Sequence, residues 1–171
     1  MIDYEILPTA RLSAAEQQSI WIWLRQAFQV LTDEYQWADA DYHLRAWDGA
    51  QLVGHVDITL RDVQAGGQPL RLGGIGGVVT LPDWRRQGIA SEALRLAQAF
   101  LCDPLDVDAG LLICDPLLLP FYARLGWQAV PGPLFFDQPD GRRRFDGQVM
   151  VLPLRIPAWP AGTIDLQGLP W

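Results

Sequence analysis

The chain has 171 residues, of which 50% are apolar and 19% are charged, a mixture that can build a hydrophobic core and argues against a wholly disordered chain. No apolar run approaches the roughly 18 residues of a membrane-spanning helix, and residues 1–5 lack the basic and apolar regions of a secretory signal. Length and composition therefore favour one domain, residues 1–171, in a cytoplasmic protein with no membrane partner.

Charge and the supply of metal ligands exclude further classes of function. The net charge of −7 comes from 20 acidic residues against 13 arginines, with no lysine. Such a chain is a poor match for nucleic acid, whose affinity depends on basic residues that neutralise phosphates. Cys102 and Cys114 form no CxxC pair, so we expect no disulfide framework. Two histidines are too few for a convincing zinc site, and we expect no metal.

Hydrophobic periodicity and turn signals predict a mixture of helices and strands. Ser13 and Glu16 form a capping-box pattern where the first helix begins. The pairs Asp48-Gly49 and Gly66-Gly67 predict tight turns between antiparallel strands. In chain order, we predict a strand (2–6), a helix (14–30), three strands (43–47, 51–63 and 70–80), a helix (87–101), a buried strand (110–114), a helix (115–125) and late strands (127–130, 133–137 and 145–154).

Two segments of this prediction are less regular. Asp115-Pro116 is a typical helix start, but Pro120 opposes a continuous helix because it lacks an N–H group. The tail, residues 155–171, has no periodicity, and we expect it either to fray or to pack back on the domain through Trp159 and Trp171.

The strand at 70–80 contains four glycines within residues 73–77. Glycine inside a strand marks a bulge or a place where a ligand or another backbone comes close, and on this segment alone a plain bulge is an equally good interpretation. Shortly after it, Arg85-Arg86-Gln87-Gly88-Ile89-Ala90 leads into the helix at 87–101. Small residues at 88 and 90, converging N–H groups and the helix dipole favour an anion there, and a diphosphate suits the site.

Two motifs resemble the GNAT superfamily of acyl-CoA-dependent N-acyltransferases. Arg85-x-x-Gly88-x-Ala90 matches their Arg/Gln-x-x-Gly-x-Gly/Ala signature, and Asp115 through Trp127 is similar to their Asn-…-Phe-Tyr-x-x-x-Gly-Phe stretch. The order of elements agrees over about residues 1–155, and the motifs are sharp over about 74–127. The resemblance implies an α/β (α+β) fold, a mixed but mostly antiparallel twisted sheet with helices on both faces. It also implies acetyl-CoA as co-substrate, no metal, a small-molecule amine as acceptor and, as is common in the superfamily, a homodimer.

The resemblance also implies roles for individual residues. Tyr122 is the candidate catalytic residue, because a phenol beside the departing thiolate can donate a proton; the alternative is a tyrosine that only packs. Backbone groups of one strand edge would pair with the amides of the pantetheine arm, unless the protein itself covers that edge. The candidate coenzyme A residues are Val78, Val79, Thr80, Arg85, Arg86, Gln87, Gly88, Ile89 and Ala90.

The base that deprotonates the amine stays open. His55 and Asp57 lie on the same face of their strand, although the polar face of such a strand is usually just solvated. Glu34, just after the first helix, and the terminal carboxylate of Trp171 are further candidates on the acceptor side. Solvent could also take the proton, with no protein base at all.

A narrower resemblance, to aminoglycoside 2′-N-acetyltransferases, rests on Val78 through Arg85, on Tyr122 through Trp127 and on the terminal tryptophan. Those enzymes hold a glutamate where this chain has Gly76, and an acidic cluster where it has the arginines at 142–144. We therefore expect Gly74 and Gly76 to leave room for a wider, less acidic acceptor pocket, suited to a neutral or singly charged amine. The competing hypothesis is an acyl-CoA-binding module that has lost catalysis.

Overall fold

The computed structural model describes residues 1–28 and 34–171. The helices are α1 (Ala14–Ala27), α3 (Ile89–Cys102) and α4 (Leu119–Ala123), with short 3₁₀ turns at Thr9–Arg11, Pro82–Trp84 and Pro116–Leu118. The strands are β1 (Ile2–Pro8), β2 (Tyr42–Asp48), β3 (Gln51–Ala65), β4 (Gln68–Thr80), β5 (Ala109–Cys114), β6 (Gln128–Ala129), β7 (Leu134–Gln138), β8 (Gly141–Phe145), β9 (Gln148–Pro153) and β10 (Ile164–Asp165). None of these helices is long and apolar enough to span a bilayer.

Local signals fix the start of α1 and the hairpins of the sheet. The Ser13 hydroxyl accepts a hydrogen bond from the Glu16 N–H at 3.3 Å, while the Glu16 carboxylate accepts one from the Ser13 N–H at 2.9 Å. This capping box confirms the predicted helix start. The helix ends at Ala27, and its predicted extension to residue 30 falls in 29–33, outside the described residues. Both predicted turns connect antiparallel strands, β2 to β3 and β3 to β4.

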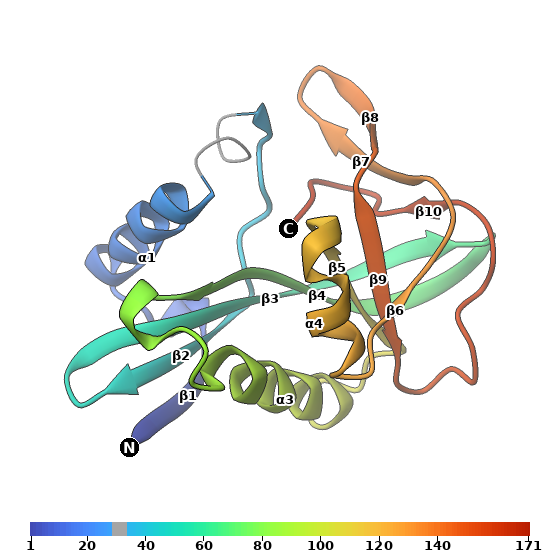
Figure 1. Cartoon of the computed structure of the whole chain (residues 1–171). Helices are drawn as coiled ribbons and strands as arrows, with labels where there is room; N and C mark the ends of the chain where they lie inside the picture. Colours follow the sequence, from blue (N-terminus) through green and yellow to red (C-terminus); the bar gives the residue numbers. More distant parts are fainter. Residues whose placement is uncertain (29–33) are drawn as a thin grey trace.

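The strands form one mixed sheet in the order β6-β9-β5-β4-β3-β10-β7-β8, with β2 and then β1 added on β3 (Figure 1). Among the strands that the structure describes, only the β4–β5 and β10–β7 pairs are parallel. Helix α3 and α4 residues build the main core on one face of the sheet, while α1 packs Ile20 and Leu24 against Val79 on the other. The predicted mixed, mostly antiparallel sheet with helices on both faces is confirmed.

Two predicted elements divide in the structure. The segment 115–125 becomes a 3₁₀ turn followed by α4, so that Pro120 falls in the first turn of a new helix, where no N–H group is needed. The predicted strand at 145–154 is wrong as one element, because β8 pairs with β7 whereas β9 pairs with β5. The break lies at Gly147, where a Cβ would meet the Phe145 ring.

The tail packs back on the domain rather than fraying. Strand β10 lies between β3 and β7, and Ile164, Leu166 and Trp171 are buried. The Trp171 indole covers Gly74 of β4 so closely that a Cβ at this position would overlap the ring. The tail is therefore part of the hydrophobic core, and the absence of a side chain at Gly74 leaves space for the Trp171 ring.

We expect Gly74→Ala to lower the free energy of unfolding by about 1–3 kcal/mol, because the added methyl group must displace the indole. Denaturant unfolding measures the change. The matched control is the same substitution in a Trp171→Ala background, where the obstacle is absent and the cost should shrink to a few tenths of a kcal/mol. Equal costs in both backgrounds would contradict this account of Gly74.

Candidate functional site

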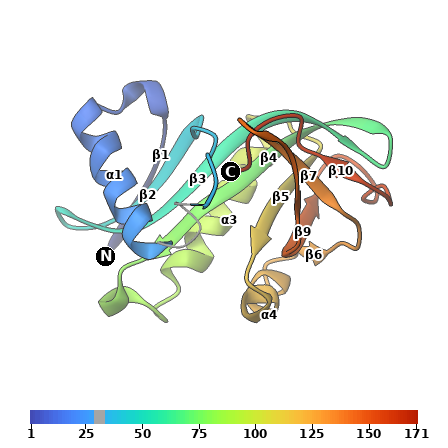
Figure 2. The ribbon, with the colours of Figure 1, turned by 90° about the horizontal axis from the view of Figure 1, so that it is seen from above.

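The two central parallel strands separate part-way along their length. Strand β4 pairs with β5 only through Leu72–Ala109, Gly73–Gly110 and Gly74–Leu111. Beyond these pairs β4 continues to Thr80 beside β3, and β5 continues to Cys114 beside β9. Figure 2 shows β5 turning away from β4. Among the described strands none pairs with β4 on this side beyond Gly74, so the backbone from Ile75 to Thr80 lines an opening, which we call the splay.

Large side chains fill the fork where the strands part. A Cβ on Gly73 would overlap Leu101, and a Cβ on Gly110 would lie 2.7 Å from Cη2 of Trp127. On the α1 face, the Trp171 indole covers Gly74 and donates its N–H to the Leu111 carbonyl at 3.3 Å. The glycines of this segment therefore admit packing groups at the fork.

This packing overturns one expectation about the acceptor pocket. The room at Gly74 holds the Trp171 ring, and a Cβ at Gly76 would lie 3.1 Å from the main-chain carbonyl carbon of Trp171. The expectation that these two glycines leave open space for the acceptor is therefore wrong. Trp171 occupies the space into which a larger side chain at 74 or 76 would point.

Strand β4 carries a bulge next to the fork. The ladder passes from the Asp57–Gly76 pair to the His55–Val79 pair, so two β4 residues, Gly77 and Val78, face one residue of β3. Gly77 has a φ of +54°, and a Cβ there would overlap the Asp57 carboxylate. Both constraints require glycine at this position. The bulge turns the β4 backbone out of the regular ladder where it lines the splay.

The predicted anion-binding turn forms at the end of β4. Gly88, with a φ of +85°, is the N-cap of α3, and Arg86 also has a positive φ. An open pocket of about 140 Å³ lies over this turn; its lining includes Thr80, Arg85, Arg86, Gly88, Ile89 and Ala90. The Gln87 side chain instead donates to the Asp83 carbonyl at 2.9 Å. Of the other predicted coenzyme A residues, Val79 is buried toward α1 and Val78 packs toward the α3 core.

The comparison with protein families agrees with this geometry. Residues 10–130 match the family model described as acetyltransferase (GNAT) domain. The chain is a GNAT acetyltransferase. The matched range covers the splay, the bulge and the turn.

Solved structures share the fold of this GNAT acetyltransferase at low sequence identity. An acyl-CoA N-acyltransferase from Pseudomonas aeruginosa is 22% identical, with a TM-score of 0.61 over 89% of this chain and 99% of that chain. A GNAT family acetyltransferase from Brucella melitensis in complex with acetyl-CoA is 19% identical (TM-score 0.59, 95% and 94%). The GNAT family N-acetyltransferase YhbS from Escherichia coli in complex with CoA is 17% identical (TM-score 0.63, 98% and 91%).

Tyr122 of this acetyltransferase is buried on α4, with its ring against Phe121 and Trp127. Burial is the main cause that raises the pKa of the Tyr122 phenol, and the thiol of Cys114 adds to it. Burial also raises the pKa of Cys114, at the end of β5. The phenol therefore keeps its proton at neutral pH and can act as a donor.

On the opposite face, beside the bulge, His55 and Asp57 join a third residue. His43 Nδ1 lies 3.1 Å from His55 Nε2 and 2.9 Å from Asp57 Oδ1, and His55 Nε2 lies 3.4 Å from the same oxygen. Sequence reasoning missed His43. The Asp48-Gly49 hairpin indicates that its strand pairs with β3, but a register shift of one residue between Ala46 and Trp47, which the sequence does not signal, sets His43 opposite Asp57. His55 is 1% exposed, so the prediction of a merely solvated strand face is wrong for this residue.

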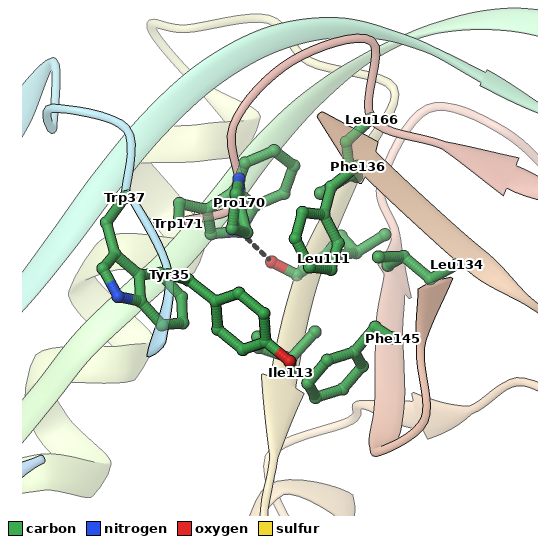
Figure 3. Close-up of a pocket in the computed structure, with 10 residues that line it drawn as sticks. All are labelled: Tyr35, Trp37, Leu111, Ile113, Leu134, Phe136, Phe145, Leu166, Pro170 and Trp171. Atoms are coloured by element: carbon green, nitrogen blue, oxygen red, sulfur yellow. Dashed lines mark hydrogen bonds between the residues drawn. The ribbon is translucent and has the colours of Figure 1, made fainter. Parts of the chain in front are cut away.

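The other acceptor-side candidates lie apart from this cluster. Glu34 is exposed and hydrogen-bonds Tyr35. Tyr35 and Trp171 line a small apolar pocket of about 10 Å³ together with Phe136 and Phe145 (Figure 3), and the Tyr35 ring contacts the Phe136 ring edge to face. The Trp171 ring therefore belongs to an aromatic surface, while its main-chain carbonyl carbon lies next to Gly76.

The three arginines of the β7–β8 hairpin are partnered by acids. Arg142 pairs with Asp165 at 2.8 Å and lies over the Phe135 ring, Arg143 pairs with Asp140, and Arg144 pairs with Asp146 at 3.3 Å. Exposed pairs of this kind contribute little energy each, but they offset the positive charge of the hairpin. This arrangement favours a solvated hairpin over a grip for an anionic acceptor.

We expect Gly88→Glu to weaken acetyl-CoA binding at least tenfold, about 1.4 kcal/mol, because it adds a carboxylate at the mouth of the pocket over the turn. Isothermal titration calorimetry measures the affinity.

The matched control is Gly88→Gln. It carries the same backbone strain at a φ of +85° and the same bulk without the charge, so it should bind more tightly than Gly88→Glu. Wild-type affinity in a folded Gly88→Glu variant would exclude this turn as the diphosphate site.

Proposed function

We propose that this protein transfers an acetyl group from acetyl-CoA to the primary amine of a small molecule by direct attack of the amine on the thioester. The observation that carries the proposal is that the edge of β4 left unpaired beyond Gly74 leads to the turn at 85–90. The β4 backbone that lines the splay ends at Thr80, which also lines the pocket over Arg85 and Arg86. Acetyl-CoA and CoA in the Brucella and E. coli structures of the same fold support this choice of donor.

The donor fits this edge and turn from its diphosphate end inward. The diphosphate would lie at the N-terminus of α3, where backbone N–H groups and the two arginines favour negative charge. The pantetheine amides would pair with the β4 edge at Val78, Val79 and Thr80, as a peptide adds to a sheet edge. This places the thioester beside the bulge.

Tyr122 is the proposed donor of the proton that the departing thiolate needs. It follows β5 on α4, near Cys114 on the wall of the splay, and its raised pKa keeps the phenol protonated. The amine arrives from the α1 face, where the acetyl group can be reached without crossing the pantetheine. The C–N bond forms, the C–S bond breaks, and coenzyme A leaves as the thiol with the Tyr122 proton; the proton that the amine nitrogen loses restores the phenol.

The acceptor side favours a neutral or singly charged amine over a polycation. Position 76 is glycine, the hairpin acids at 140, 146 and 165 are already paired with arginines, and the pocket beside Trp171 is apolar. The resemblance to aminoglycoside 2′-N-acetyltransferases therefore supports the chemistry rather than the sugar substrate. Thiol release from acetyl-CoA across a panel of ethanolamine, benzylamine, spermidine and kanamycin tests this proposal. Acetyl-CoA binding without release on any amine would instead support a binding module.

We expect Tyr122→Phe to lower kcat by about 10²- to 10⁴-fold with unchanged acetyl-CoA affinity, since only the hydroxyl is removed. Steady-state kinetics with the best amine of the panel, together with calorimetry, separates the two effects.

The control is Leu119→Ala, which perturbs the packing of α4 against the core but keeps the phenol and lies outside the lining of the pocket over the turn. A loss of less than threefold in Tyr122→Phe would make Tyr122 a packing residue. Because burial raises the phenol pKa, the basic limb of the rate profile below pH 10 should be the same in wild type and variant.

A further inference from the structure

A buried chain of polar groups connects β2, β3 and β4 beneath α1. Asp57 Oδ1 contacts His43 Nδ1 at 2.9 Å, His43 Nδ1 contacts His55 Nε2 at 3.1 Å, and His55 Nδ1 contacts the Gly77 carbonyl oxygen at 3.1 Å. Trp23 of α1 packs against the His55 ring. This series of contacts ends at Gly77, the first residue of the bulge. The proposed reaction, with acetyl-CoA as acetyl donor and Tyr122 as proton donor, gives these three side chains no role.

Hydrogen-bonding rules fix which atoms carry protons. A carbonyl oxygen only accepts, so the N–H group in the bond to Gly77 belongs to His55 Nδ1. Burial, the largest influence on it, lowers the pKa of His55, and a neutral imidazole with a proton on Nδ1 has a lone pair on Nε2. His43 Nδ1 must then be the donor to that lone pair, and the negative charge of Asp57, whose Oδ1 lies 2.9 Å from the same nitrogen, favours the proton on His43 Nδ1. Asp57 and His43 thereby hold His55 in a single tautomer.

The alignment of the two imidazoles supports a direct N–H···N bond. Their ring centroids are 5.3 Å apart and the facing nitrogens 3.1 Å apart, so these nitrogens point at each other nearly in line. A metal ion shared by the three side chains would require both nitrogen lone pairs to point at the ion instead.

The hydrogen bond from His55 to the Gly77 carbonyl sets the orientation of a peptide group. The Gly77–Val78 bond is trans, and in a planar trans peptide the C=O and N–H groups point in opposite directions. Because the Gly77 carbonyl points at His55 of β3, the Val78 N–H points away from β3 and from the α1 face. It is therefore directed at the side on which the proposed thioester lies.

We propose that His55 is a positioning residue: locked in one tautomer by His43 and Asp57, it holds the Gly77–Val78 peptide so that the Val78 N–H donates to the thioester carbonyl oxygen. This inference rests on the proposed function. When the amine nitrogen bonds to the carbonyl carbon, the C=O electron pair moves to the oxygen, and the N–H group stabilises the negative charge there. The C–S bond then breaks and the C=O bond re-forms. The ammonium form of the amine loses two protons, one to solvent and one, by way of Tyr122, to the thiolate.

The experiment compares His55→Phe, which keeps a ring but removes the donor, with His55→Asn, whose side-chain amide places an N–H near the position of Nδ1. Infrared spectra of bound [1-¹³C]acetyl-CoA report the thioester carbonyl without any acceptor amine. We expect its stretch to be lowered in wild type, to return toward the value of free acetyl-CoA in His55→Phe, and to be lowered again in His55→Asn. Acetyl-CoA affinity should stay within about threefold in both variants.

Kinetics and NMR provide independent measurements. With the best amine of the panel, kcat should fall about 10- to 100-fold in His55→Phe at unchanged KM for acetyl-CoA. This loss is somewhat smaller than that expected when a hydrogen-bond donor to the oxyanion is removed, because the Val78 N–H is still present. In His55→Asn, kcat should recover in part. Nitrogen-15 spectra of the free protein should show His55 as the Nδ1–H tautomer, and Asp57→Asn should weaken that preference. Thr59 is a buried polar residue further along β3, and Thr59→Val is the control for general disturbance of the strand. This variant should leave the stretch of the thioester carbonyl unchanged.

Three results would overturn the inference while leaving the proposed function intact. They are an unchanged carbonyl stretch in a folded His55→Phe variant, an Nε2–H tautomer of His55 in the free protein, and one equivalent of a metal such as zinc in the purified protein that is lost in His43→Asn. If wild-type protein does not bind acetyl-CoA, both the inference and the proposed function are wrong.

Discussion

The separation of β4 from β5 is the constraint on which the rest of the site depends. Two parallel neighbours would ordinarily continue their ladder, and here three residue pairs form before the strands part. Leu101 and Trp127 fill the fork from one face and Trp171 from the other, each against a glycine. Dense packing of this kind resists closure, because a strand cannot move in without displacing these side chains.

The bulge extends this constraint along β4. Backbone groups freed from a ladder lose hydrogen bonds and are ordinarily costly unless something else binds them. At the bulge, part of that cost is offset within the protein, by the bond from His55 to Gly77. The edge that remains, next to the turn with its arginines, is proposed to be completed by the donor. Such a division leaves the backbone shaped before the ligand arrives, which reduces the ordering that binding must supply.

The sequence predicts what depends on near neighbours and misses what depends on distant ones. The capping box of α1, the hairpins around Gly49 and Gly66, and the turn at 85–90 all follow from residues within a few positions of one another, and all are present. Trp171 over Gly74 joins residues 97 positions apart, and no local pattern indicates it. The glycines of β4 correctly indicate that another group comes close to this strand. At Gly74 that group is the Trp171 side chain rather than a ligand in an open pocket.

His43 shows why the site was only partly predictable. Its place in a strand follows from alternation and from the Asp48-Gly49 turn, but its role depends on the register shift between Ala46 and Trp47, which sets it opposite Asp57 of β3. A shift of this kind changes which groups meet across strands without changing the pattern along either strand. Buried polar clusters are therefore harder to predict than the turn at 85–90, whose geometry a short motif contains.

Trp171 lies both at the proposed acceptor pocket and at the fork beside the proposed donor site, so a change at this residue would affect both sites. Its ring lines the small aromatic pocket on the proposed acceptor side and, through the bond to Leu111 and the contact with Gly74, forms one side of the fork. A lineage that exchanged this tryptophan for a smaller residue to admit a bulkier amine would also loosen the wedge between β4 and β5. Changes of substrate in this enzyme should therefore arise more readily at Tyr35 and Phe145, which line the same pocket but do not touch the fork glycines, than at the end of the tail.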